Sequence, residues 1–93
     1  MVTAIVTLKV DRNKVAEIAA KLSGMEGITE VYSVSGQFDL IALVRTRDAD
    51  MLASIVTGTM LKVDGILDSE TMFAFRTYSK HDLESMFSIG ADD

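Results

Sequence analysis

The sequence predicts a single α+β domain with the element order β-α-β-β-α-β. Stretches in which apolar residues recur every second position, as in strands, alternate with stretches that carry apolar residues at helical spacing. The chain has 93 residues, of which 48% are hydrophobic, and it contains no Pro and no low-complexity tract. This composition is typical of one compact domain, so we expect residues 1–93 to fold together.

The first third of the chain predicts a strand, a helix and a second strand. Residues 2–10 alternate between an apolar face and a mixed face, which indicates a strand. Asp11 begins a capping segment for a helix. The apolar stripe of this helix consists of Val15, Ile18, Ala19 and Leu22. We expect Gly24 to end the helix in a left-handed conformation and residues 28–34 to form the second strand.

A hairpin and a strongly apolar third strand follow. The turn is expected at residues 35–37, few enough to join antiparallel neighbours. The third strand, about residues 38–45, is apolar in succession from Leu40 to Val44. Such a strand is typically covered on both faces. We place it at one edge of the sheet.

The rest of the chain predicts a second helix, a long strand and a terminal helix. Asp48 is placed to cap a helix, and Gly58 weakens the end of that helix. The helix stripe consists of Met51, Leu52, Ile55 and Val56. We expect the last strand at residues 66–78 and a short helix at about residues 82–88.

This element order predicts a ferredoxin-like βαββαβ fold. Two right-handed crossovers would place both helices on one face of a four-stranded antiparallel sheet. The other face would be bare, and the double-sided apolar third strand argues against its exposure to solvent. We therefore expect two copies to pack sheet to sheet, as a dimer of the α/β barrel type.

Charge and composition argue against several functional classes. Nine Lys and Arg against fourteen Asp and Glu give a net charge of −5, the wrong sign for direct contact with nucleic acid. The chain contains no Cys for a disulfide or a thiolate site. No apolar run approaches the ~20 residues of a membrane-spanning helix. Because the start does not resemble a signal peptide, we expect a cytoplasmic protein without membrane contact.

No enzyme or metal-site signature is present. The sequence lacks a glycine-rich phosphate loop, a His-x-x-x-His pair and a carboxylate-rich metal cluster. The single histidine, His81, is interpreted as a solvated residue after the last strand. We therefore expect no catalytic residue, no metal and no cofactor.

Two polar clusters are candidates for a binding site. In the hairpin, Gly36 and Asp39 lie beside Phe38; taken alone, the residues favour a structural role in which Gly36 permits the turn and Asp39 accepts backbone hydrogen bonds. In the last strand, the hydroxyls of Ser69 and Thr71 share a face, although Thr suits strands in any case. We expect the two clusters to meet between subunits more easily than within one chain.

Three segments carry a resemblance to a known family. They are residues 27–31, the hairpin at residues 35–40 and the segment 63–71. With the element order, they resemble the effector-binding (RAM) domain of the Lrp/AsnC transcriptional regulators over nearly the whole chain. The most specific element is Gly36-x-x-Asp39 followed by Gly65-Ile66-x-x-Ser69-x-Thr71.

The resemblance implies a module of transcription regulation that binds an amino acid or a related small metabolite. Its homodimers would assemble into octamers or decamers, with the effector between dimers. The hairpin would offer backbone groups and an aromatic wall, and Asp39 would pair with the effector's ammonium group. The implied ligand-binding residues are Gly36, Gln37, Phe38, Asp39, Ser69 and Thr71.

One departure from the family and several alternatives bear on function. Family regulators carry a helix-turn-helix domain before this module, whereas the first strand here begins at residue 2; we expect a stand-alone domain that binds amino acids alone or co-assembles with full-length regulators. The alternatives are a small dimeric ferredoxin-like enzyme of the monooxygenase or isomerase type, an ACT-type sensor with sheets side by side, and a ligand-free assembly adaptor. An enzyme would need an enclosed pocket with His, Arg or Tyr, and the tyrosines near strands are Tyr32 and Tyr78.

Overall fold

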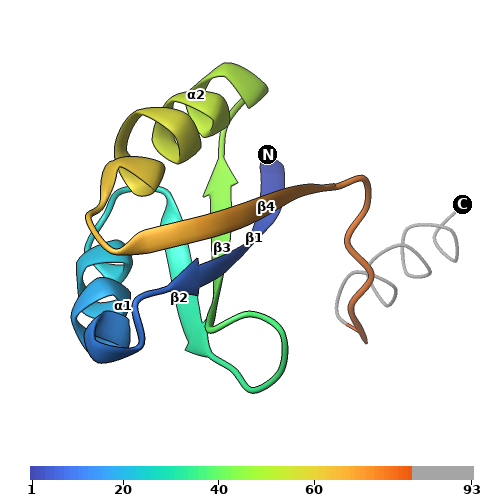
Figure 1. The fold of residues 1–93 in the computed structure, drawn as a ribbon. Coiled ribbons are helices and arrows are strands. Elements are labelled where there is room, and N and C mark those ends of the chain that lie inside the picture. Colours follow the sequence, from blue (N-terminus) through green and yellow to red (C-terminus); the bar gives the residue numbers. More distant parts are fainter. Residues whose placement is uncertain (81–93) are drawn as a thin grey trace, which may run out of the picture.

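The computed structural model describes residues 1–80, and in this range four strands form one antiparallel sheet (Figure 1). The strands are β1 (Val2–Val10), β2 (Ile28–Ser33), β3 (Leu40–Thr46) and β4 (Ile66–Ala74). Their order across the sheet is β2-β3-β1-β4. The predicted ferredoxin-like βαββαβ fold is therefore confirmed.

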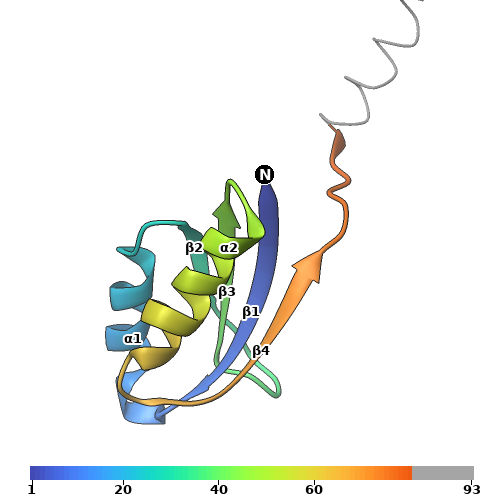
Figure 2. The ribbon, with the colours of Figure 1, turned by 90° about the horizontal axis from the view of Figure 1, so that it is seen from above.

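Both helical regions lie on one face of the sheet (Figure 2). The helix α1 (Val15–Ser23) follows a 3₁₀ turn, η1 (Arg12–Lys14). The helix α2 (Ala49–Ala53) continues into the π-helix η2 (Ser54–Thr59) and the 3₁₀ turn η3 (Met60–Lys62). Between the helices and the sheet lies the core, which contains Ala4, Val6, Leu8, Val10, Ile18, Leu22, Ile28, Leu40, Ala42, Val44, Leu52, Val56 and Met60.

The predicted caps form at the starts of both helical regions, but Gly24 does not take the predicted conformation. Asp11 and Asp48 each accept a backbone hydrogen bond through a side-chain oxygen, as N-caps do. Gly24 has φ −86° and continues the right-handed turn. The reversal comes at Gly27, with φ +89°, where an added Cβ would lie 2.5 Å from Cδ1 of Ile55. Both the positive φ and the close approach of Ile55 therefore favour glycine at position 27.

The second helical region is regular over only a short stretch. The hydroxyls of Thr57 and Thr59 donate to the carbonyl oxygens of Ala53 and Ile55, at 2.6 and 2.8 Å. Such back-bonding, together with the low helix propensity of Gly58, disfavours a regular α-helix. The α-helical part ends at Ala53, and the wider π-helix follows.

The prediction that the third strand lies at an edge is wrong. β3 pairs with β2 on one side and with β1 on the other, where Leu40 lies opposite Leu8. The crossover through α1 carries the chain past one strand position, and β3 fills the gap between β1 and β2. This interior position explains why β3 is apolar in succession.

The hairpin is longer and the last strand shorter than predicted. β2 ends at Ser33 and β3 begins at Leu40, so the loop spans residues 34–39. β4 ends at Ala74 rather than at residue 78, because Ala74 pairs with Thr3 and β1 begins only one residue earlier. Phe75 is fully exposed. His81 and the helix predicted at residues 82–88 lie outside the described residues.

The sheet face turned away from the helices is largely apolar near its centre. Ile5, Ile41 and Leu43 are half-buried there, and Met72 of β4 is 43% exposed. Within residues 1–80 no helix covers this face (Figure 2). We call it the open face.

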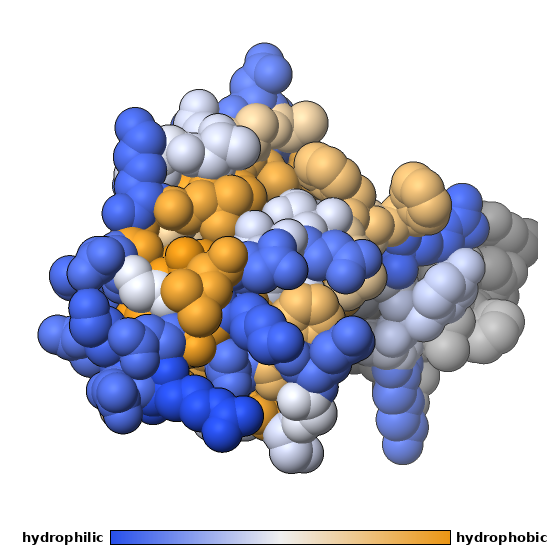
Figure 3. All heavy atoms as spheres, viewed as in Figure 1, coloured by the Kyte–Doolittle hydropathy of each residue, from blue (hydrophilic) through white to orange (hydrophobic). Residues whose placement is uncertain are grey.

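Apolar side chains also reach the surface on the helix side. They gather where η2 and η3 pass the start of β4 (Figure 3). Here Ile55, Leu61, Val63 and Ile66 are partly buried against the core.

No helix in the described part of the chain is long and apolar enough to cross a membrane.

Candidate functional site

A cleft of about 500 Å³ lies where β1 ends, beside the loop between β2 and β3. Three segments line it: the end of β1 with η1, the loop 34–39, and the start of β4. The lining residues are Lys9, Val10, Asp11, Arg12, Gly36, Gln37, Asp39 and Leu67. The sheet therefore brings segments that are far apart in sequence to one end of the domain.

Asp39 is fastened to β1 by both its backbone and its side chain. Its N–H donates to the carbonyl oxygen of Leu8 at 2.9 Å, and its Oδ2 accepts a hydrogen bond from the N–H of Val10, also at 2.9 Å. The N–H of Val34 donates to the carbonyl oxygen of Asp39 at 3.0 Å and closes the loop. These contacts fix the half-buried carboxylate at the wall of the cleft.

Of the other predicted loop residues, Gly36 and Gln37 line the cleft and Phe38 does not. Gly36 lines the cleft with φ +111°, and an added Cβ would meet no atom within 4 Å. Its conformation, rather than a lack of space, therefore favours glycine. Gln37 also lines the cleft and is exposed, whereas Phe38 is half-buried and does not line it.

Ser69 and Thr71 do not line the cleft of their own chain. Ser69 lies opposite Leu8 and Thr71 opposite Val6, both of which point into the core. The two hydroxyls therefore lie on the helix-facing side of the edge strand β4. From β4 the cleft receives Leu67 instead. A contribution of Ser69 and Thr71 to a site shared between subunits stays a prediction.

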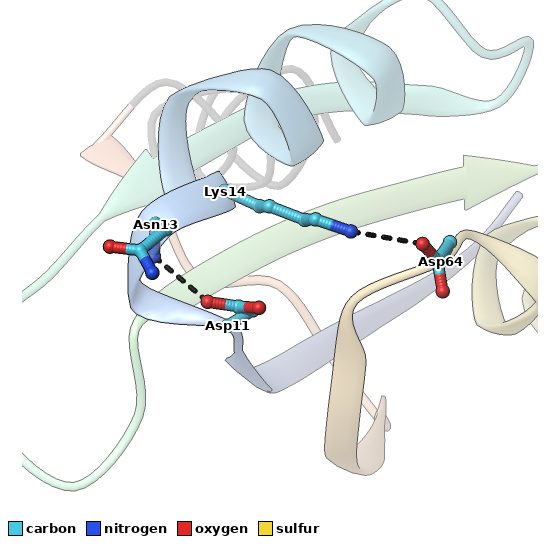
Figure 4. A network of polar contacts seen from close by, with 4 residues as sticks. All are labelled: Asp11, Asn13, Lys14 and Asp64. Carbon is cyan, nitrogen blue, oxygen red and sulfur yellow. Dashed lines mark hydrogen bonds and ion pairs between the residues drawn. The ribbon is translucent and has the colours of Figure 1, made fainter.

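Polar contacts hold the rim of the cleft around η1 (Figure 4). Oδ1 of Asp11 accepts the N–H of Asn13 at 3.0 Å, and the N–H of Asp11 donates to the carbonyl oxygen of Gly65 at 2.8 Å. Nearby, Nζ of Lys14 and Oδ2 of Asp64 form an ion pair at 3.0 Å. These contacts tie η1 to the segment that leads into β4.

The ion pair between Lys14 and Asp64 shifts the pKa of each partner. The hydrogen bond from the Lys14 ammonium, reinforced by its charge, lowers the pKa of Asp64. The same hydrogen bond raises the pKa of Lys14. Because both groups are solvent-accessible, the pair adds only modest stability.

The structure adds five lining residues to those suggested by the sequence: Lys9, Val10, Asp11, Arg12 and Leu67. Lys9 and Arg12 are the cationic additions, which the sequence does not mark in any way as site residues. Arg12 lies in a segment that the sequence marks only as a helix cap, and Lys9 occupies an ordinary polar position of β1. The one signal that could have found them is the pairing of the end of β1 with the start of β3, which local patterns do not reveal.

Tyr32 and Tyr78 are exposed and do not line the cleft. Residues 1–80 contain no group of three or more acidic or histidine side chains that could hold a metal ion.

Comparison with known proteins decides the family. The family model described as the Lrp/AsnC ligand binding domain matches residues 3–83. The chain belongs to this family.

Two transcriptional regulators are similar to this chain over most of its length. The HTH-type transcriptional regulator FL11 of Pyrococcus abyssi is 30% identical over 77 residues, which cover 83% of this chain and 50% of FL11. The uncharacterized HTH-type transcriptional regulator YugG of Bacillus subtilis is 28% identical over 95 residues, which cover 99% of this chain and 56% of YugG. The chain therefore spans about half the length of these two regulators.

Solved structures agree with the fold. TTHA0845 from Thermus thermophilus is 38% identical with a TM-score of 0.80, and the match covers 86% of this chain and 100% of that one. FFRP-DM1 is 33% identical with a TM-score of 0.77, covering 81% and 100%. Escherichia coli AsnC, at 20% identity and a TM-score of 0.78, covers 84% and 53% and shows the same fold.

Proposed function

We propose that this Lrp/AsnC ligand-binding domain binds an amino acid or a related small metabolite in the cleft beside Asp39. The observation that carries the proposal is a carboxylate fixed at the wall of an open cleft in a domain of a ligand-binding family. A Neisseria meningitidis transcriptional regulator with the same fold, at 15% identity and a TM-score of 0.75, was solved as a complex with L-Met. Ligand capture of this kind serves transcription regulation rather than catalysis.

The chemistry assigned to Asp39 uses its free oxygen. Oδ2 is occupied by the N–H of Val10, and Oδ1 accepts no hydrogen bond from the described residues, apart from any that Ser79 makes. Oδ1 therefore receives the effector's ammonium group in a charge-assisted hydrogen bond. Gly36 and Gln37 add backbone groups from the loop, where glycine lets a ligand approach closely.

A second part of the proposal concerns assembly. The apolar open face packs against the same face of a second copy, and the resulting dimers assemble further into octamers or decamers. Effector bound between dimers would then also meet Ser69 and Thr71 of a neighbouring subunit. Co-assembly with full-length regulators would connect this binding to DNA.

Ligand binding is tested by thermal unfolding against each of the twenty amino acids, with light scattering alongside. A ligand at ~100 times its dissociation constant should add ~2.7 kcal/mol of stability. Asp39→Asn keeps an oxygen for the N–H of Val10 but removes the charge. Because breaking a desolvated pair costs ~2–5 kcal/mol, this variant should lose the stabilisation by ligand while keeping the fold.

The matched control for this test is Asp48→Asn. It makes the same change at a helix cap that does not line the cleft, and it should bind like the parent. If Asp39→Asn binds as tightly as the parent, the role of Asp39 is wrong. If no amino acid shifts the unfolding temperature, a ligand-free adaptor is favoured instead.

Dimerisation is tested by placing a charge on the open face. Leu43→Glu puts a carboxylate in the middle of the proposed interface, where its burial without a partner is costly, and should reduce the mass seen by light scattering. Ala20→Glu makes an exposed change on α1 and should leave the mass unchanged. Circular dichroism checks that both variants are folded. A folded Leu43→Glu variant with the parent's mass would exclude this face as the interface.

A further inference from the structure

Two cations of the cleft, Lys9 and Arg12, have no acidic partner among the described residues. The ion pair found within residues 1–80 joins Lys14 to Asp64. Apart from any contact with Ser79, the side chains of Lys9 and Arg12 form no hydrogen bond or ion pair with the described residues. Both side chains are exposed and line the cleft. Asp11 and Asp39 line the same cleft, yet neither forms an ion pair with these cations. Two cations without an ion pair at one cleft stand out in a chain whose net charge is −5.

The two carboxylates that line the cleft, and the one that lies opposite Lys9 across the sheet, accept hydrogen bonds from the backbone. Asp39 accepts the N–H of Val10, and Asp11 accepts the N–H of Asn13. Asp68, which lies opposite Lys9 across the β1–β4 pair, accepts its neighbour's N–H at 2.9 Å. Each acid keeps its charge but is oriented by a main-chain donor and forms no ion pair with Lys9 or Arg12, so both cations can pair directly with a ligand.

We propose that Lys9 and Arg12 bind an anionic side-chain group of the effector, so that the cleft prefers acidic amino acids such as L-glutamate and L-aspartate. This inference rests on the proposed function, because it assigns the ammonium group of the same ligand to Asp39. The α-carboxylate meets the loop at Gly36 and Gln37, and the second carboxylate meets the two cations. A cleft of about 500 Å³ is within the usual range for small-molecule sites and has room for a ligand of this size.

The charge balance separates this ligand class from others. A neutral side chain at this position would partly desolvate both cations without giving them a partner, which costs free energy. A basic side chain would be repelled by them. An acidic amino acid supplies one positive and two negative groups, which match Asp39, the loop N–H groups and the two cations.

The test is calorimetric titration of the 93-residue chain with L-glutamate, L-glutamine, L-aspartate and L-asparagine. Each acid differs from its amide almost only in charge. Each acid should bind about tenfold more tightly than its amide, and the gap should narrow at high salt because the pairs are accessible to screening. Lys9→Gln and Arg12→Gln should each reduce this preference by about threefold. The control Lys62→Gln, an exposed cation on η3 that does not line the cleft, should leave it unchanged.

The outcomes separate this inference from the proposed function. Amides that bind as tightly as the acids would overturn the inference, as would binding of neutral amino acids without the acids, and both results leave amino-acid binding intact. A preference for acids that survives in the Lys9→Gln/Arg12→Gln double variant would also overturn it. If no member of the full set of twenty amino acids binds, the proposed function and the inference fail together.

Discussion

Replacing Asp39 by Ala should destabilise the fold as well as abolish binding. The change removes the acceptor for the N–H of Val10, a residue only 2% exposed, which cannot readily turn to water instead. A hydrogen bond to a charged group contributes ~1.5–3 kcal/mol, and Asp39 is only half-buried, so we expect a loss of about 1.5–2.5 kcal/mol in the free energy of unfolding. For a domain of this size the loss corresponds to a fall of roughly 6–20 °C in the unfolding temperature.

Asp39→Asn separates this structural contribution from charge. The amide oxygen can still accept the N–H of Val10, so we expect less than half of the destabilisation seen with Ala. Urea unfolding followed by circular dichroism measures both variants against the parent. Protein concentration is held fixed, because assembly adds to apparent stability. Equal losses for Asn and Ala, or a loss below about 0.5 kcal/mol for Ala, would refute the assignment of this hydrogen bond.

Four further substitutions test other parts of the domain. Gly36→Ala should cost about 1–2 kcal/mol in urea unfolding because of its positive φ, whereas Gly58→Ala, with equal space and no positive φ, should be neutral or stabilising by up to about 1 kcal/mol. Leu40→Ala, at a fully buried site, should cost ~2–5 kcal/mol, measured by the same unfolding; a cost below about 1 kcal/mol would contradict the packing. The pKa of Asp64 is lowered in the folded state, so the stability that it adds is present above its unfolded pKa and is lost as pH falls through the folded value. Asp64→Asn should therefore be less stable than the parent at neutral pH and converge with it in acid, as a pH series of urea midpoints would reveal.

The fold could be predicted because its signals are local. Alternation in β1 and the stripes of the two helical regions follow from residues only a few positions apart, and Asp11 and Asp48 cap where the pattern places them. The end of β4 could not be predicted in the same way. Its sequence stays strand-like to residue 78, but the strand ends where its partner β1 begins, and only the pairing determines that limit.

The candidate site was predictable in part. The resemblance directs attention to Gly36, Gln37 and Asp39, which the structure places at one cleft. Lys9 and Arg12 carry no local signal, because their place at the cleft depends on the pairing of β1 with β3 and on the direction of the turn that follows β1. Motif reading therefore does not reveal cations that line the cleft when they come from other segments of the chain than the motif.

The geometry of Asp39 is compatible with both a structural role and a binding role for the hairpin. One carboxylate oxygen holds the N–H of Val10, while the cleft has access to the same carboxylate. Asp11 follows Val10 in the chain, and its N–H donates to the carbonyl oxygen of Gly65, the residue just before β4. If a ligand binds Asp39 as proposed, it would act on the end of β1 through the Val10 hydrogen bond. Through the hydrogen bond from Asp11 to Gly65, it would also act on the start of the edge strand β4. If ligand binding weakens the bond to Val10, hydrogen exchange at the Val10 N–H should speed up in the complex, although ligand stabilises the domain as a whole.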